Sequence, residues 1–300
     1  MERPKLIGLV ALSVMLGCGL FSAAHTKRVS AAEDLVLPAK RQAKTDLEVR
    51  WKSGGKAFLG YVSYQKLLTL PQVAATVVDD ETFTALHAPK VQVTGVTLDV
   101  LAKTLKAPEE LDLMLARCLD GYVGSFPTEY LARHHPILVL TVNGMTISEW
   151  AAKVGEPDLG PYMVTYDNFV PAWHVLAHQD RPQIPDEMIG LELKTQKDVF
   201  GPVTPAARFG PGSPERAGFE IAKQNCFRCH AAGPYGGTKA GLSWEALSMI
   251  AKSDRALFER YVHDPKSVSP GATMPENPKY DAATLAALSS YFRAMSLVEQ

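Results

Sequence analysis

Two cysteines and a histidine stand at a spacing that suits covalent attachment of a cofactor. Cys226, Cys229 and His230 form a single C-x-x-C-H motif, the pattern at which a c-type haem is bound. The two thiols can add across the vinyl groups of the ring, and the neighbouring imidazole can then bind the iron. One alternative is half of a zinc site, although no further pair of thiolates or imidazoles stands nearby. Another is a redox-active cysteine pair, although a helical stretch precedes the motif.

A methionine downstream can complete the coordination of such an iron. A six-coordinate electron-transfer haem needs a second donor opposite the histidine. Met274 offers a thioether in the loop 271–275 (GATMP), whose glycine and proline interrupt any helix. The rival donors Met249, Met295 and His263 stand on stretches of helical pattern, where a methionine more often fills a core. Met274 is therefore the predicted second axial ligand.

The C-terminal part as a whole resembles a known family. From about Ser213 the chain has a helical stretch leading into Cys226, a glycine-containing loop at 233–237, short helical stretches, a methionine-proline loop and a closing helix. This order resembles a class I cytochrome c domain. Gly218 matches the small residue at which the first and last helices of that family cross. Ala222 stands where the family usually has an aromatic residue.

The resemblance implies an all-α domain over 213–300 that carries one covalently bound haem c. By residue, it implies attachment of the haem through Cys226 and Cys229 and axial ligation of its iron by His230 and Met274.

The bulk composition describes an ordinary globular protein. The 300 residues allow two domains, 46% of them are apolar, and the formal net charge is −1. This balance gives no bias toward a polyanion, so nucleic acid is not an expected partner. Two of the 4 cysteines, Cys18 and Cys118, lie outside the C-x-x-C-H motif. No disulfide framework is therefore expected.

The start of the chain carries the pattern of an export signal. A short basic stretch at 1–5 precedes an uncharged apolar run at 6–24. Since haem c is matured outside the cytoplasmic membrane, export agrees with the C-x-x-C-H motif. Three outcomes stay open for the segment 1–32: cleavage at a small-residue site, lipidation at Cys18, or retention as a membrane anchor. The expected location is the periplasm or the outer face of the cytoplasmic membrane.

Between residues 46 and 195 the pattern changes to short strands separated by turns. Residues 91–96 alternate between apolar and polar, and 113–116 and 137–142 are continuous apolar runs of strand length. Asn143-Gly144 then predicts a tight turn of the hairpin type. Further strands are expected at 162–166 and 191–193, and a short helix at 98–105. The pattern predicts an α+β domain with a mixed sheet.

This α+β region is similar to the molybdopterin-binding domain of the sulfite-oxidase type. The similarity runs through 64–71, 91–105, 115–122, 142–144 and 160–164. In that family a cysteine at the end of a strand binds molybdenum through its thiolate, and Cys118 stands at the matching place. The resemblance thus implies molybdopterin as a second cofactor and Cys118 as a metal ligand. The alternative is a buried thiol that acts as a small hydrophobe.

Other histidines give weaker indications. His174 and His178 lie four apart, a spacing that would put both imidazoles on one helical face as metal ligands, but no third ligand stands nearby. The sequence 134–136 (HHP) precedes a strand and is predicted to be an exposed turn. Neither a glycine-rich phosphate loop nor a hydrolase nucleophile motif is recognisable.

Glycine and proline mark a boundary between the two halves. Residues 200–205 (FGPVTP) and 209–212 (FGPG) predict a linker that is semi-rigid because of its prolines. The expected organisation is an export segment or anchor at 1–32, an α+β domain at 46–195, a linker at 196–212 and a cytochrome c domain at 213–300.

Together these patterns predict an exported single-haem electron carrier whose donor and acceptor are redox proteins. An enzyme is the alternative: a molybdopterin oxidoreductase, with Cys118 on the metal, that oxidises a small oxyanion such as sulfite and passes the electrons to its own haem. A third interpretation is a binding module, in which the sheet domain tethers the cytochrome to a partner complex. The molybdenum content of the protein would separate the first two.

Overall fold

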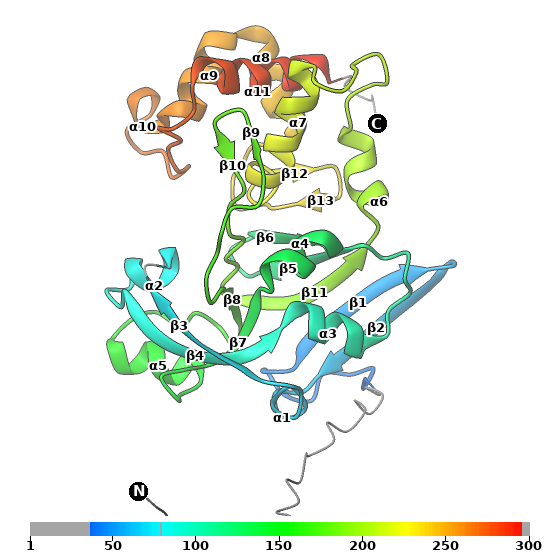
Figure 1. Cartoon of the computed structure of the whole chain (residues 1–300), viewed down its shortest axis with the longest axis vertical. Coiled ribbons are helices and arrows are strands. Elements are labelled where there is room, and N and C mark those ends of the chain that lie inside the picture. Colours follow the sequence, from blue (N-terminus) through cyan, green and yellow to red (C-terminus); the bar gives the residue numbers. More distant parts are fainter. Residues whose placement is uncertain (1–36, 79, 296–300) are drawn as a thin grey trace, which may run out of the picture. The chain divides into compact units, whose positions relative to one another are not determined.

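The apolar runs of the first half form two β-sheets in the computed structural model, which describes residues 37–78 and 80–295. The larger sheet has the order β2-β1-β11-β5-β6; β1 and β11 run parallel, and the other neighbours are antiparallel. Its strands are β1 Leu47–Ser53, β2 Lys56–Val62, β5 Leu113–Cys118, β6 Val123–Pro127 and β11 Met188–Lys194. The predicted α+β content with a mixed sheet is confirmed (Figure 1).

The second sheet is antiparallel, with the order β3-β4-β7-β8. Its strands are β3 Val73–Val78, β4 Lys90–Thr97, β7 Ile137–Val142 and β8 Met163–Thr165. Asn143 and Gly144 both have positive φ and close the predicted tight turn, in which Val142 pairs with Met145. The chain then enters helix α5 (Ile147–Val154) instead of a second long strand.

Short helices connect the strands and cover the sheets. They are α1 Tyr64–Leu68, α2 Glu81–Ala85, α3 Leu98–Leu105 and α4 Thr128–His134. Helix α3 has the predicted bounds and buries its apolar face, including Leu98 and Leu101, in the same core cluster as Met114 of β5. This core therefore packs against one face of strand β5.

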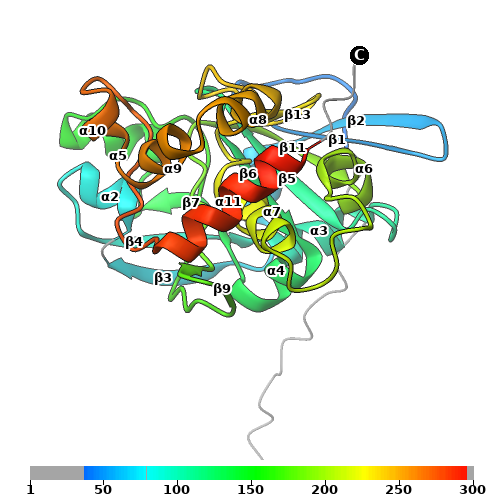
Figure 2. The ribbon, with the colours of Figure 1, turned by 90° about the horizontal axis from the view of Figure 1, so that it is seen from above.

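The C-terminal part is helical and is built around a close crossing. Its helices are α7 Pro214–Asn225, α8 Trp244–Ser253, α9 Arg255–His263, α10 Pro265–Val268 and α11 Ala282–Ala294. Helix α11 runs across α7 (Figure 2) at Gly218, where a Cβ atom would lie 2.1 Å from the carbonyl oxygen of Ala287. Because no side chain fits at that distance, the predicted crossing at Gly218 is confirmed.

The first part of the segment predicted as a semi-rigid linker, residues 196–203, is packed against a core. Residues 196–203 form helix α6 (Gln196–Phe200) and a 3-10 turn (Gly201–Val203). Their apolar side chains are buried in one core cluster with residues of β5 and of the C-x-x-C-H motif: Val199, Phe200 and Val203, with Leu113, Leu115 and Phe227. The density of glycine and proline predicted a linker because it marks breaks in the backbone, but it says nothing of where the intervening apolar residues pack.

The predicted export segment at 1–32, with Cys18, lies outside the described residues. Within the part of the chain that the structure describes, no helix is both long enough and apolar enough to span a bilayer.

Candidate functional site

The C-x-x-C-H motif forms the turn that ends α7. The Cys226 N–H donates to the carbonyl oxygen of Ala222 at 2.8 Å, as the last helical bond. The N–H groups of Cys229 and His230 then both donate to the carbonyl oxygen of Cys226, at 3.1 and 3.0 Å. Both cysteines are free, partly buried thiols. The tight turn therefore brings together the three residues that haem attachment requires.

The imidazole of His230 is held through one of its two nitrogens. The residue is 7% exposed, and its Nδ1 lies 2.7 Å from the carbonyl oxygen of Leu242. Since a carbonyl can only accept, Nδ1 carries the proton and Nε2 keeps the lone pair that binds a metal. Burial lowers the pKa of His230 and so favours the neutral, metal-binding form. This bond to the far nitrogen is how proteins commonly orient a metal-binding imidazole, and the arrangement fits a haem ligand.

The two thiols are protonated in this environment. Burial raises the pKa of Cys226 to about 12 and raises the pKa of Cys229 as well. A redox-active pair instead lowers the pKa of its attacking thiol, and zinc is bound by thiolates. Among the described residues, no group of three or more His, Cys, Asp or Glu side chains could hold a metal ion. The raised pKa of both thiols is unlike that of a redox-active pair, whose attacking thiol has a lowered pKa.

The glycine-containing loop after His230 folds back onto the motif. It forms a small ribbon of β12 (Ala231–Ala232) and β13 (Tyr235–Gly236). The Gly237 N–H then donates to the carbonyl oxygen of Phe227 at 2.8 Å. A Cβ at Gly237 would lie 2.1 Å from the carbonyl oxygen of Arg228, so a glycine is needed for this close approach.

Met274 lies in a loop that a buried asparagine, Asn277, attaches to the end of α9 by hydrogen bonds. Its side chain is partly buried against the core cluster that Cys226 also contacts. Asn277 is 2% exposed, and its side-chain nitrogen donates to the carbonyl oxygen of Val262 at 2.9 Å. Its backbone N–H donates to the carbonyl oxygen of His263 at 2.9 Å. The end of α9 thus fixes the position of the Met274 loop.

The rival donors lie in different surroundings. Met249 on α8 is 55% exposed, so it faces solvent and not a buried cofactor site. His263 is the last residue of α9. Met295 follows the end of α11 and is partly buried against the core. Met274 remains the predicted second ligand.

Backbone hydrogen bonds attach the motif to the larger sheet. The Val123 N–H, at the start of β6, donates to the carbonyl oxygen of Arg228 at 2.9 Å. The Thr238 N–H donates to the carbonyl oxygen of Gly121 at 2.7 Å. Gly121 has φ +83° and lies so close that a Cβ would be 2.5 Å from the hydroxyl oxygen of Thr238. The turn between β5 and β6, residues 119–122, therefore lies directly against the C-x-x-C-H motif and the loop that follows it.

Side chains extend this contact. The ammonium group of Lys239 forms an ion pair with Asp120 of the β5–β6 turn. Phe227, inside the motif, is fully buried and lies 4.9 Å from Phe200 of α6, measured between ring centroids. Haem-motif residues and sheet residues thus share one apolar core.

Cys118, the predicted molybdenum ligand, ends β5 as a buried thiol that is 6% exposed. Burial raises its pKa first, and the carboxylates of Asp120 and Asp186 raise it further. The adjacent Arg117 guanidinium is engaged by Glu48. A metal thiolate needs the opposite, an electropositive pocket that lowers the thiol pKa. The burial of Cys118 and the acidic groups beside it agree with the alternative of an inert core thiol.

The pair His174 and His178 does not lie on a helix. Instead, the chain forms a hairpin of β9 (His174–Val175) and β10 (His178–Gln179), with Leu176 at φ 55° in the turn. The side chain of His174 is exposed, whereas His178 is fully buried. The helical face that the spacing of the two histidines allowed does not form, because spacing alone does not show that the segment turns back on itself.

The predicted exposed turn at 134–136 is correct for His135 and wrong for His134. The side chain of His135 is 61% exposed. That of His134 is 3% exposed, and its Nε2 lies 2.7 Å from Oδ2 of Asp180. The ring of Phe169 stacks on it at 4.5 Å. The partner carboxylate comes from a distant part of the sequence, so no local pattern indicated this buried pair.

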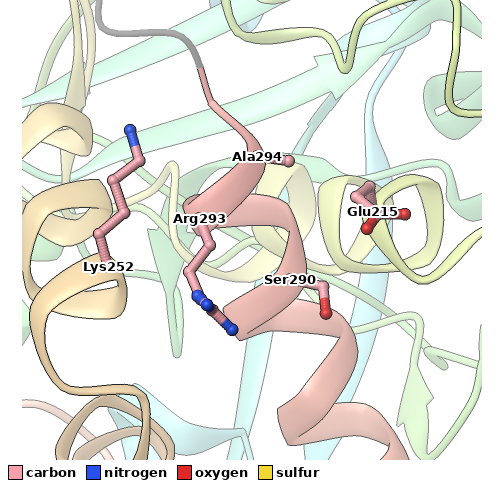
Figure 3. A pocket seen from close by; sticks show the side chains of 5 residues that line it. All are labelled: Glu215, Lys252, Ser290, Arg293 and Ala294. Atoms are coloured by element: carbon pink, nitrogen blue, oxygen red, sulfur yellow. The ribbon is translucent and has the colours of Figure 1, made fainter.

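Two surface pockets lie away from the residues predicted to bind haem. A shallow pocket of about 320 Å³ lies between the ends of α7, α8 and α11 (Figure 3); it is lined by Glu215, Lys252, Ser290, Arg293 and Ala294. Another, of about 330 Å³, lies where α4, β6 and α7 meet and includes Tyr130, Trp173 and Gln183. Neither pocket is lined by the motif cysteines, His230 or Met274.

Comparison with known proteins gives a weak structural neighbour. No family model matches the chain, and no curated protein matches it. Among solved structures, the sulfane dehydrogenase SoxCD from Paracoccus pantotrophus is similar to part of it, with a TM-score of 0.34 and 16% sequence identity. The match covers 53% of this chain and 40% of that chain. The chain thus spans less than half the length of this neighbour.

Proposed function

We propose that this protein is an exported c-type cytochrome that carries electrons through one covalently bound haem. The observation that carries the proposal is the hydrogen bond from His230, the last residue of the C-x-x-C-H motif, to the carbonyl oxygen of Leu242, which leaves Nε2 available for iron. Cys226 and Cys229 would form the thioethers, and Met274 would supply the second axial ligand. When bound, the haem supplies one-electron chemistry.

The residues around the motif would tune this chemistry. Phe227 and Trp244 are fully buried and pack edge to face at 6.4 Å between ring centroids. An apolar, water-poor surrounding disfavours the additional positive charge of oxidised iron, and a thioether ligand acts in the same direction. We therefore expect a high-potential site that exchanges electrons with redox proteins outside the cytoplasmic membrane.

The surroundings of Cys118 favour an electron carrier over a molybdenum enzyme. Its thiol is buried beside Asp120 and Asp186, whose charges oppose a thiolate. In this proposal the sheet part is a scaffold that contacts the haem motif through the β5–β6 turn.

The experiment is to produce the full chain in a host that matures c-type cytochromes and to test whether the haem is covalent. We expect haem to stay on the chain through denaturation and acid extraction, with iron equimolar to protein. Cys226→Ala and Cys229→Ala should each disrupt covalent attachment, whereas the matched Cys118→Ala variant should keep its haem. Haem that is extracted from the wild type would contradict the proposal, and molybdenum equimolar to iron would support the enzyme instead.

A further inference from the structure

The β9–β10 hairpin of the sheet part reaches the helices that frame the Met274 loop. It lies beside α7 (Figure 1). At its turn the Ala177 N–H donates to the hydroxyl oxygen of Thr284, at the start of α11, at 3.0 Å. Next to this bond the side chain of His178 is fully buried. A histidine from the sheet part is thereby inserted into the helical part.

The protonation of His178 follows from its partners. Its Nε2 lies 2.9 Å from Oε1 of Gln224, an oxygen that can only accept, because the amide nitrogen of the same side chain donates to Arg181. Nε2 therefore carries the proton. Burial lowers the pKa of His178 to about 4, so the ring is neutral near pH 7 and its Nδ1 is an acceptor. The hydroxyl of Tyr280, 2.6 Å away, must then donate to Nδ1.

From Tyr280 a chain of hydrogen bonds leads to the Met274 loop. Asn225, the last residue of α7, donates through Nδ2 to the Tyr280 hydroxyl at 3.1 Å and to Oδ1 of Asn277 at 3.3 Å. Asn277 is the buried residue that fixes the loop, and its side-chain nitrogen also lies 3.5 Å from the carbonyl oxygen of Pro275. Pro275 directly follows Met274. The network thus joins the hairpin to the residue after the ligand.

We propose that His178 is a positioning residue for the axial methionine: the hairpin, through Tyr280, Asn225 and Asn277, holds the Met274 loop in its ligating conformation. This inference rests on the proposed function, since it requires a haem iron that Met274 binds. In physical terms, His178 fixes the direction of the only proton of the Tyr280 hydroxyl. That leaves the lone pairs of the oxygen to accept from Asn225.

The test uses the full-length holoprotein and imidazole, which competes with the methionine for oxidised iron. His178→Phe keeps a ring of similar size but leaves Gln224 and Tyr280 without their partner. We expect apparent imidazole binding to tighten by about tenfold, because one lost bond in a buried network shifts an equilibrium by roughly that factor. The matched control is His174→Phe, on the same hairpin but exposed, which should bind imidazole like the wild type.

A second variant keeps the test decisive if His178→Phe does not mature. Tyr280→Phe removes only the hydroxyl and should tighten imidazole binding to a similar extent. In the double variant that combines His178→Phe and Tyr280→Phe, the change in the free energy of imidazole binding should be smaller than the sum of the two single changes. Both substitutions break the same chain of hydrogen bonds.

Two results would overturn the inference, and they are distinguishable. Unchanged imidazole affinity in His178→Phe and Tyr280→Phe, with only a lower melting temperature, would show that the hairpin merely stabilises the fold. A wild-type holoprotein that lacks the near-infrared sulfur-to-iron band would overturn methionine ligation itself, and with it both this inference and the ligand assignment of the proposed function.

Discussion

Among the methionines of the C-terminal helices, Met274 and Met249 differ in their surroundings. Met274 is partly buried on the core cluster, whereas Met249 is 55% exposed. Met274→Ala should abolish the near-infrared sulfur-to-iron band and lower the reduction potential, because a thioether donor favours reduced iron. Met249→Ala should leave both unchanged. Survival of the band in Met274→Ala would assign the ligand to another methionine, with Met295 the next candidate.

Cys118 allows a second test with one atom changed. Cys118→Ser places a hydroxyl in an apolar core, which should lower the free energy of unfolding by about 1 kcal/mol or somewhat more. Haem content and reduction of the haem by protein partners should stay as in the wild type. Chemical denaturation and haem spectra measure the two effects. Loss of sulfite-driven or other substrate-driven haem reduction, at a nearly unchanged melting temperature, would instead indicate a molybdenum ligand.

The sequence can predict the role of a residue when its partners are its neighbours in the chain, and cannot when they are distant in the sequence. The C-x-x-C-H motif is contiguous, so its residues were located without a structure. The carbonyl of Leu242 that orients His230 could not be located, since every residue carries a carbonyl. The same holds for His134, whose burial depends on Asp180 and Phe169. Partners brought together only by the fold leave no mark on the local pattern.

At the scale of elements, the crossing of α7 and α11 is the most constrained contact of the helical part. Gly218→Ala would place a methyl group 2.1 Å from the carbonyl oxygen of Ala287. Since this oxygen belongs to a helix backbone, the helices must separate, and we expect destabilisation of about 1–3 kcal/mol or more. Thermal unfolding of the holoprotein measures it. The control is Gly210→Ala, where a Cβ meets nothing within 4 Å; an equal loss in both variants would contradict the packing argument.

Helices and strands whose apolar residues recur at a regular spacing were predicted well. Those whose conformation depends on contacts with distant residues were not. Helix α3 and strand β4 follow from their own apolar spacing. The β9–β10 hairpin does not, because its two short strands are held by contacts with α7 and α11, such as the bond of Ala177 to Thr284. A helical spacing of two histidines is compatible with both outcomes, and tertiary contacts decide between them.

At the scale of the molecule, the sequence predicts that a fragment starting near Gly212 takes up haem by itself. The structure leads us to expect that this fragment is less stable than the full chain. Without the residues before Gly212, Phe227 would lose its ring contact with Phe200. The carbonyl oxygen of Arg228 would lose the hydrogen bond that it accepts from the Val123 N–H. The fragment should therefore accumulate less holoprotein than the full chain and melt at a lower temperature. Equal yield and equal melting temperature would show that the helical part is self-sufficient.

One signal of this shared core was present in the sequence. The apolar run in β5 alternates between two cores: Met114 and Ala116 face one, and Leu113 and Leu115 face the other. A strand that is apolar on consecutive positions is covered on both sides. The sequence therefore indicated that another element covers the second face of β5, but it did not indicate that this element belongs to the C-terminal helical part.

The burial of the C-x-x-C-H motif also sets an order of events during maturation. Phe227 is fully buried and Arg228 is bonded to Val123, a residue far away in the sequence. If a haem is attached here as proposed, the attachment enzyme must reach the motif before these contacts close, so haem attachment and folding would compete in time. Contacts between distant residues form slowly, and this delay gives the enzyme its opportunity. A chain that folded first would hide the motif, and the proposed haem attachment would then depend on how often the contact between Arg228 and Val123 reopens.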